Sequence, residues 1–296
     1  MNESYWNKQL DFLKSIRTGW FNNDYIEFLI DKVWKIKKPV NIIDFGCGFG
    51  YIGLLFMPLL PKGSTYTGID ISENLLAEAK NIFSTLDYNS RFIKADLNEY
   101  FPDKKYDIAI SQAVLRHIPN SKKILNKMIE SVSDGGLVIC MEGDLEIEKT
   151  SQYFSGLDYI GLDMPSLYRQ KYRNEFMTGG RDYRIGIKLP IIMQELGLHD
   201  VDVRMNDRVK FINPKGNKET HDKELKAMIK AWGWDENLSD YEEKELFQSL
   251  LNKGLNKKDA LNYIAGEKAI RSYIINNKDI TYILQAPCIM ISYGIK

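Results

Sequence analysis

Apolar and polar residues follow two different periods along the first half of the chain. Residues 24–36 place apolar side chains at helical spacing, and a short apolar run at 40–45 follows them and is halted by glycines. Four more strand-like runs come next, at residues 66–70, 91–95, 106–110 and 137–141. Helix-like segments separate most of these runs, which is typical of a parallel sheet with helices on both faces.

The pattern changes after the fifth predicted strand. Residues 144–180 are rich in tyrosine, arginine and acidic residues and show no clear strand. Residues 201–211 alternate between apolar and polar side chains, which predicts a strand with one exposed face. Residues 219–276 are helical and charged, and the nearly all-apolar run 287–293 predicts a last strand.

These patterns predict a doubly wound α/β fold, with a seven-stranded, mostly parallel sheet whose last strand is antiparallel. Two insertions are expected to form a helical cap above the ligand crevice. The predicted domains are a cofactor-binding core with an N-terminal lid helix at 1–143, a helical cap insertion at 144–180, continued core at 181–212, a second helical insertion at 213–278 and the last core strand at 279–296.

A glycine-rich turn follows the first predicted strand. It reads Asp44-Phe45-Gly46-Cys47-Gly48-Phe49-Gly50, and its glycines let the backbone approach a ligand where a Cβ atom would collide. Together with Gly53 it matches the dinucleotide-binding pattern G-x-G-x-x-G, which is a weak signal by itself. Asp70 stands 20 residues after Gly50, at the end of the second predicted strand, where a carboxylate can accept hydrogen bonds from ribose hydroxyls.

Asp44 distinguishes two classes of enzyme that share this turn. A dinucleotide places its pyrophosphate over the glycines, and an acidic side chain there would repel it. S-adenosylmethionine instead brings a cationic ammonium and a sulfonium, which an acidic side chain attracts. The pattern therefore favours S-adenosylmethionine over NAD(P). The alternative interpretation is that Asp44 only caps the turn that follows it.

The chain resembles a known family in the segments that carry these residues. They are similar to segments of the class I S-adenosylmethionine-dependent methyltransferases, above all of the small-molecule group with the ubiquinone and menaquinone methylases: IIDFGCGFG, YTGIDIS, KADL, YDIAISQAVLRHI and VSDGGLVICMEGD. The resemblance covers about residues 24–143 well and the last two strands loosely. It implies S-adenosylmethionine as cofactor, S-adenosylhomocysteine as product, and methyl transfer to an O, N or C atom of a small molecule that it does not identify.

The resemblance also assigns residues to the cofactor. The glycine turn lies against the methionine moiety with Asp44 at the ammonium, Asp70 holds the ribose hydroxyls, and Ile71 packs on the adenine. Asp96 accepts a hydrogen bond from the adenine amino group, next to the backbone amide of Leu97. The full predicted set is Asp44, Gly46, Cys47, Gly48, Gly50, Asp70, Ile71, Asp96, Leu97, Ser111 and Gln112.

Some of these residues also have a simpler interpretation. Ser111 and Gln112, at the end of the fourth strand, would face the reacting methyl group or merely contact solvent, and Asp96 would bind adenine or cap a helix. His117 and Glu142 are the candidate catalytic residues, because both follow strands that end at the predicted crevice. Each has a structural alternative: a hydrogen-bonding histidine and a capping glutamate.

The first insertion supplies the candidate residues for the acceptor. Its tyrosines and arginines can bind a flat or carboxylated molecule, and we select Tyr153 and Arg173 as substrate-binding residues. The alternative is that these side chains form the outer surface and the seam of a helical cap.

Composition narrows the partners and the compartment. Forty basic residues balance forty acidic ones, so no overall field draws the chain to nucleic acid. No long apolar run predicts a membrane span, and three scattered cysteines indicate a reducing, cytoplasmic compartment. Histidines and cysteines lack zinc spacing, so no metal is expected. Two other classes stay open, a non-catalytic S-adenosylmethionine-binding protein and an NAD(P)-dependent oxidoreductase, and the sequence does not indicate an oligomeric state.

Overall fold

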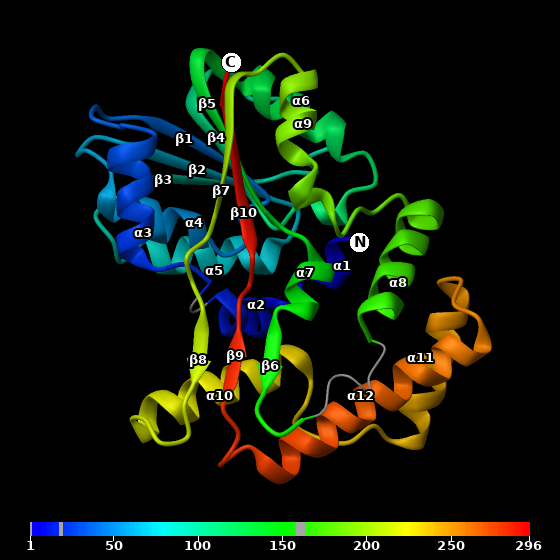
Figure 1. Cartoon of the computed structure of the whole chain (residues 1–296). Coiled ribbons are helices and arrows are strands. Elements are labelled where there is room, and N and C mark those ends of the chain that lie inside the picture. The colour runs from blue at the N-terminus through cyan, green and yellow to red at the C-terminus, as the bar shows by residue number, and fades with distance from the viewer. Residues whose placement is uncertain (1, 18–19, 158–163) are drawn as a thin grey trace. The chain divides into compact units, whose positions relative to one another are not determined.

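The chain divides into two compact units in the computed structural model, which describes residues 2–17, 20–157 and 164–296. Unit 1 consists of Met1–Asp144, Arg181–Asp207 and Cys288–Lys296, and unit 2 of Leu145–Gly180 and Arg208–Pro287. Each unit has a sheet of its own (Figure 1).

Unit 1 is built on a seven-stranded sheet with the strand order β3-β2-β1-β4-β5-β10-β7 (Figure 1). Its strands are β1 (Asn41–Phe45), β2 (Thr65–Asp70), β3 (Asn89–Lys94), β4 (Tyr106–Gln112), β5 (Val132–Gly143), β7 (His199–Met205) and β10 (Ile289–Ile295). β1 to β5 pair in parallel, whereas β10 runs antiparallel to β5 and β7. The predicted sheet is thereby confirmed. Its strand order reverses between β1 and β4, which is where such sheets bind ligands.

Helices cover both faces of this sheet, because alternate residues of a strand point to opposite faces. The fully buried Ile42 belongs to a core with α3 (Asn23–Phe28), α4 (Tyr51–Phe56) and α5 (Glu73–Phe83). Its neighbour Ile43, equally buried, belongs to a second core with α6 (Ser121–Ser131) and α9 (Leu189–Glu195). The sheet is therefore apolar on both faces, as the unbroken apolar run in β1 predicts.

Side chains just before the helices fix where α5 and α6 begin. Ser72 Oγ accepts the Leu75 N–H at 3.2 Å, and Asn120 Oδ1 accepts the Lys123 N–H at 3.4 Å. Two short helices precede the sheet, α1 (Glu3–Trp6) and α2 (Leu10–Arg17). The Ser72 hydroxyl also donates to Asn7 Oδ1 at 2.7 Å, so the end of α1 is attached to the start of α5.

Unit 2 contains a three-stranded antiparallel sheet in addition to its helices. The strands are β6 (Gln152–Phe154), β8 (Lys210–Ile212) and β9 (Ile283–Gln285), in the order β6-β9-β8. Phe154, Ile283 and Ile212 lie in register across it, and each is 1% exposed. The helices are α7 (Leu145–Thr150), α8 (Met164–Gly179), α10 (Lys218–Trp232), α11 (Asp240–Asn252) and α12 (Lys257–Asn277).

Two details of the strand prediction are wrong. The single strand expected at 201–211 is two strands, β7 and β8, which belong to different sheets. Beyond β7, Asn206 Oδ1 accepts the Ile289 N–H and Nδ2 donates to the Trp20 carbonyl, both at 2.8 Å, so its side chain takes the place of a continuing strand. Residues 144–180, expected to lack a strand, contribute β6, whose pairing depends on the distant β9.

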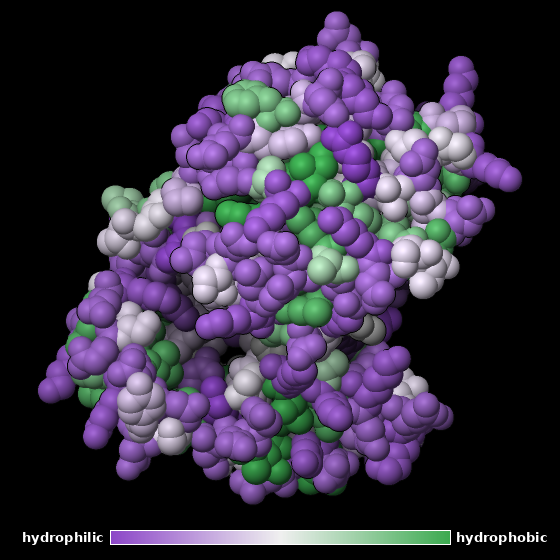
Figure 2. Space-filling view, turned by 180° about the vertical axis from the view of Figure 1, so that it is seen from behind, coloured by the Kyte–Doolittle hydropathy of each residue, from purple (hydrophilic) through white to green (hydrophobic). Residues whose placement is uncertain are grey.

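Hydrophilic side chains cover most of the face seen in Figure 2, and hydrophobic side chains appear there in small groups. No helix in the described ranges is long and apolar enough to cross a membrane. Cys47, Cys140 and Cys288 carry free thiols, so these three residues add no covalent link to the fold.

Candidate functional site

The glycine turn after β1 folds tightly onto the end of β2. The Gly46 and Cys47 N–H groups both donate to the Ile69 carbonyl, at 2.8 and 2.9 Å. Gly46 has φ +78°, and a Cβ atom there would stand 2.5 Å from Val114 Cγ2. Both the backbone conformation and the close neighbour therefore require glycine at this position.

Asp70, at the end of β2, is joined to this turn. Its Oδ2 accepts the Gly48 N–H at 2.9 Å, and its Oδ1 accepts the Ser72 N–H at 2.8 Å. Burial raises the pKa of Asp70, against the lowering effect of these backbone hydrogen bonds. A carboxylate has about four lone-pair sites, so acceptor capacity for a pair of ligand hydroxyls is left.

Asp44 lies one residue before the end of β1 and is 1% exposed. Its Oδ2 accepts the Tyr66 hydroxyl at 2.5 Å, and no described residue donates to its Oδ1. Burial raises the pKa of Asp44 to about 7, although the Tyr66 hydrogen bond acts in the opposite direction. A buried carboxylate oxygen without a donor is costly, and a cationic ligand would remove that cost.

Arg17 is a half-buried cation near Asp44 that the sequence did not reveal. Its guanidinium lies 4.3 Å from the centroid of the Trp20 ring. Burial lowers its pKa from 12.5 to about 10, while the charges of Asp44 and Glu142 act to raise it. No described residue accepts a hydrogen bond from Nη1. A guanidinium with a donor left over is suited to a carboxylate.

Buried polar atoms without a partner gather around the ends of β1 and β4. Ser111 is fully buried and Gln112 is 4% exposed, and they come directly after Ile110, which pairs with Asp44. Within the described part of the chain, five such atoms belong to this region: Arg17 Nη1, Asp44 Oδ1, Ser111 Oγ, Gln112 Nε2 and His117 Nδ1. Native proteins rarely leave buried polar groups unsatisfied, so this concentration indicates the place of a polar ligand.

Asp96 and Leu97 follow β3 in a compact loop. Asp96 Oδ1 accepts the Asn98 backbone N–H at 2.8 Å and the Asn98 side-chain amide at 3.0 Å. Lys127 Nζ donates to the Leu97 and Asn98 carbonyls, at 3.1 and 2.6 Å, and these hydrogen bonds attach the loop to α6. One oxygen of Asp96 thus has a local structural role. The contact of Asp96 with adenine stays a prediction, and so does the contact of the half-buried Ile71 with adenine.

His117 is enclosed by aromatic rings. The centroid of its ring lies 5.2 Å from that of Trp6 and 5.8 Å from that of Tyr183, both edge-on. Burial, followed by the charges of Arg116 and Arg17, lowers the pKa of His117 to about 3. The imidazole is therefore neutral near pH 7 and can accept or donate a hydrogen bond, but it is a weak base.

Glu142 has structural partners for both of its carboxylate oxygens, and its catalytic role stays a prediction. Its side chain is fully buried, and Oε1 accepts the Val114 and Leu115 N–H groups, both at 2.7 Å. Oε2 accepts Arg116 Nε at 2.9 Å, in a pair that is almost wholly buried. The structure assigns both carboxylate oxygens to the turn after β4. These contacts stabilise the turn that leads from β4 to His117.

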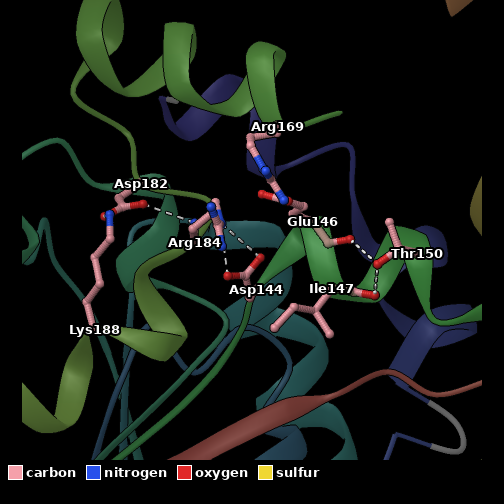
Figure 3. A network of polar contacts seen from close by, with 8 residues as sticks. All are labelled: Asp144, Glu146, Ile147, Thr150, Arg169, Asp182, Arg184 and Lys188. Carbon is pink, nitrogen blue, oxygen red and sulfur yellow. Dashed lines mark hydrogen bonds and ion pairs between the residues drawn. The ribbon is translucent and has the colours of Figure 1, made fainter. Parts of the chain in front are cut away.

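Two further groups of ion pairs include acidic residues that directly follow β5 in the chain, Asp144 and Glu146 (Figure 3). In unit 1, the fully buried Asp144 accepts Arg184 Nε at 3.0 Å, and Lys188 Nζ lies 2.6 Å from Asp182. In unit 2, Arg169 Nε donates to Glu146 Oε1 at 2.7 Å, which ties α8 to α7. These pairs stabilise the points at which the chain enters and leaves the two units.

The two residues selected for the acceptor lie in unit 2, both exposed. Tyr153 is on β6 and is 58% exposed, and Arg173 is on α8. No hydrogen bond or ring contact joins them within the described residues, and their role in acceptor binding stays a prediction. Nor do three metal-ligating side chains gather anywhere in the described ranges.

Known proteins resemble this chain in its first half. A family model described as a methyltransferase domain matches residues 36–176. The ubiquinone biosynthesis O-methyltransferase of Rickettsia typhi is 25% identical over 142 residues, which are 47% of this chain and 55% of that protein. The demethylmenaquinone methyltransferase of Staphylococcus aureus is 28% identical over 129 residues, which are 40% of this chain and 53% of that protein.

The chain thus spans about half the length of these curated relatives. Among solved structures, phosphoethanolamine N-methyltransferase 2 of Haemonchus contortus, in complex with phosphomonomethylethanolamine and S-adenosylhomocysteine, aligns with a TM-score of 0.48 and 14% identity. That alignment covers 98% of this chain and 58% of the other. The matched domain carries the glycine turn and both acids. The comparisons therefore support the prediction that residues 36–176 carry a domain of the class I S-adenosylmethionine-dependent methyltransferase kind.

Proposed function

We propose that this protein transfers the methyl group of S-adenosylmethionine to an O, N or C atom of a small-molecule acceptor. The observation that carries the proposal is the set of buried, unsatisfied polar atoms beside the glycine turn. S-adenosylmethionine has a cationic ammonium, a carboxylate and two ribose hydroxyls, and the site offers a chemical partner for each of them.

The methionine end is proposed to lie between the ends of β1 and β4. Asp44 Oδ1 would bind the ammonium, and Arg17 Nη1 would bind the carboxylate in a charge-assisted hydrogen bond. Ser111 and Gln112 would bind the remaining polar atoms of this end. These contacts satisfy groups that are otherwise buried without a partner, which is why the residues fit this cofactor.

The nucleoside end is proposed to lie beyond the end of β2. Asp70 would accept hydrogen bonds from both ribose hydroxyls while keeping its two backbone N–H donors. Ile71 would pack on the adenine, with Asp96 and the Leu97 amide at its edge. The Gly46–Gly48 backbone, with Cys47 and Gly50, would border the methionine side of the ribose.

The cofactor, when bound, supplies a methyl group on a sulfonium. Displacement at such a carbon is in line and needs no metal, so the chain's own residues contribute mainly by positioning and by excluding water. His117 is proposed to orient the acceptor through Nδ1 rather than to remove a proton, because its imidazole is neutral and weakly basic. Glu142 keeps His117 in place through the turn at Val114–Arg116.

The balanced charge of the chain favours a small molecule over a nucleic acid as the acceptor. We propose that unit 2, with Tyr153 and Arg173, contributes to acceptor recognition, since the residues predicted for the cofactor all belong to unit 1. A non-catalytic S-adenosylmethionine-binding protein is the competing function, and turnover separates the two.

The test is a screen for methyl transfer. The full chain is incubated with S-adenosylmethionine and a fractionated metabolite extract, and mass spectrometry follows the appearance of S-adenosylhomocysteine and of products heavier by one methyl group. We expect one fraction to yield both. Stoichiometric cofactor binding without turnover on any fraction would favour the non-catalytic function.

A further inference from the structure

Unit 2 holds a group of charged and aromatic residues to which the cofactor assignment gives no role. Lys149 of α7 and Lys171 of α8 are half-buried. Within the described residues, neither ammonium has a carboxylate oxygen within 4.0 Å. Lysines that lose contact with water usually acquire an acidic partner, so these two need an explanation.

Aromatic rings surround both ammonium groups. Lys149 Nζ lies 3.4 Å from the centroid of the Trp232 ring, and Lys171 Nζ lies 4.9 Å from that of Tyr263. Tyr168 connects the two halves, because its ring is 5.8 Å from Lys149 Nζ and 5.6 Å, edge-on, from Tyr263. We call Lys149, Tyr168, Lys171, Trp232 and Tyr263 the lysine–tyrosine cluster.

The ammonium groups retain most of their hydrogen-bonding capacity. Each has three donors, and within the described residues the single acceptor is the Tyr263 hydroxyl, 3.2 Å from Lys171 Nζ. Cation–π contacts hold the two charges in place but do not use these donors. The cluster therefore presents a pair of oriented cations with donors left for a ligand.

The neighbouring acids already have other partners. Glu175 lies 3.8 Å from Lys253, and the carboxylate of the nearly buried Glu267 accepts the Tyr168 hydroxyl at 3.5 Å. The charged groups that face one or both lysines are Glu148, Glu175, Lys253 and Glu267. None of the three acids comes within ion-pair distance of Lys149 or Lys171 in the described part of unit 2.

The pKa values of both lysines are lowered, as expected for ammonium groups that lack an acidic partner. Burial lowers the pKa of Lys149 to about 8, although Glu267 acts to raise it. Burial, followed by the charges of Lys253 and Lys149, lowers the pKa of Lys171 to about 8 as well. An anion placed between the two ammonium groups would restore their charged form, which is a favourable contribution to its binding.

We propose that the lysine–tyrosine cluster binds a small organic anion, a carboxylate or a phosphate monoester, with Lys149 and Lys171 as its hydrogen-bond donors and the tyrosine rings beside its carbon skeleton. A cationic ligand fits less well, because the lysines occupy the ring faces that would receive it. If the chain transfers methyl groups as proposed above, this anion is part of the acceptor. The acceptor class is then an anionic metabolite.

The experiment uses two probes, phenyl phosphate and benzoate, titrated separately into the full chain by calorimetry without S-adenosylmethionine. At least one probe should bind, and Lys149→Met and Lys171→Met should each weaken its affinity about tenfold or more. Lys244→Met, on an exposed lysine of α11, should leave it unchanged. Lys171→Arg keeps the charge and should retain most of the binding, which controls for misfolding.

The pH dependence of probe affinity is a second, independent test of the proposal. Because the lysines lose their protons near pH 8 in the free protein, probe affinity should fall as pH rises through about 8, and Lys171→Arg should weaken this dependence. Binding of phenyl phosphate alone identifies a phosphate ester, and binding of benzoate alone identifies a carboxylate. No binding of either probe, or equal binding by the wild type and both methionine variants, would overturn the proposal.

A separate titration with S-adenosylhomocysteine keeps this outcome distinct from the proposed function. A chain that binds S-adenosylhomocysteine but neither anion contradicts the anion site alone. A chain that binds an anion through Lys149 and Lys171 but no S-adenosylhomocysteine contradicts the methyl-transfer function and leaves the anion site standing.

Discussion

The charge of Asp44 determines how strongly the site attracts the cationic end of its ligand. Its pKa of about 7 means that the carboxylate gains a proton as pH falls below neutrality. We therefore expect affinity for S-adenosylhomocysteine to be highest near pH 8 and to decrease by up to about tenfold per unit well below pH 7. Calorimetric titrations across this range measure the effect. A flat profile would show that Asp44 does not contact the ammonium.

The Tyr66 hydroxyl provides a control on this assignment. Its hydrogen bond lowers the pKa of Asp44, so Tyr66→Phe should move the midpoint of the affinity profile to higher pH. Tyr88→Phe, on a ring that makes no contact with Asp44 among the described residues, should leave the midpoint in place. The stability of the fold depends on pH in the opposite direction to the ligand affinity. Because the folded-state pKa lies above the unfolded value of 3.8, this group's contribution is complete at low pH and is lost as pH rises towards 7.

Arg17 is the residue whose removal should most affect the methionine end. Arg17→Met removes a charge-assisted hydrogen bond to the ligand carboxylate, worth about 1.5–3 kcal/mol, or about tenfold to a hundredfold in affinity for S-adenosylhomocysteine. Arg91→Met, on an exposed arginine of β3 that pairs with Asp103, is the matched control. Equal affinities in the two variants would show that Arg17 does not bind the ligand carboxylate.

At the level of elements, the turn between β1 and α4 should tolerate no side chain at Gly46. Gly46→Ala introduces both an unfavourable positive φ and a contact of 2.5 Å with Val114. Gly135→Ala has the same φ of +78° but nothing within 4 Å of the added methyl group, so it isolates the backbone term, about 1–2 kcal/mol. Urea unfolding should show a clearly larger loss of stability for Gly46→Ala. Equal losses would mean that Val114 moves away at no cost.

The turn after β4 depends on the buried Glu142–Arg116 pair. Removing either partner leaves a buried charge, so Glu142→Ala and Arg116→Met should each destabilise the fold by about 3–5 kcal/mol. The double variant should cost less than the sum of the two, because it leaves no unpaired charge. Denaturant unfolding of the four proteins completes this cycle. Strict additivity would contradict the positioning role assigned to Glu142.

Local sequence signals were sufficient for most elements of unit 1. The apolar run of β1, the Ser72 and Asn120 caps and the glycine turn each depend on residues close together in the chain. β6 was not predictable in this way, since three residues form a strand there only because β9, far along the chain, pairs with them. The end of β7 at Asn206 likewise depends on Ile289, which no local pattern reveals.

On the scale of the whole molecule, the same distinction separates the predicted site residues from the missed ones. Asp44 and Asp70 stand at strand ends, and parallel strands bring those ends to one edge of the sheet. Arg17 comes from a separate helix, and its burial depends on tertiary packing that the sequence does not express. The lysine–tyrosine cluster combines residues of four helices, α7, α8, α10 and α12, and no local pattern reveals it for the same reason.

The predicted domain boundaries and the assignment of the insertions to the acceptor remain predictions. The division into unit 1 and unit 2 is a property of the fold, whereas a role in specificity is a property of binding. Tyr153→Ala and Arg173→Ala are expected to reduce acceptor turnover and to leave cofactor affinity within a few-fold. Once an acceptor is known, steady-state kinetics will measure this. A loss of cofactor affinity instead would show that these residues act on the cofactor and not on the acceptor.

The most direct test of the central claim is calorimetric titration of the purified chain with S-adenosylmethionine, S-adenosylhomocysteine and NADH. The buried partners at Asp44, Arg17 and Asp70 predict saturable binding of the first two ligands at one site per chain, and no binding of NADH. Tight binding of NADH, with no heat from either methionine-derived ligand, would contradict the account.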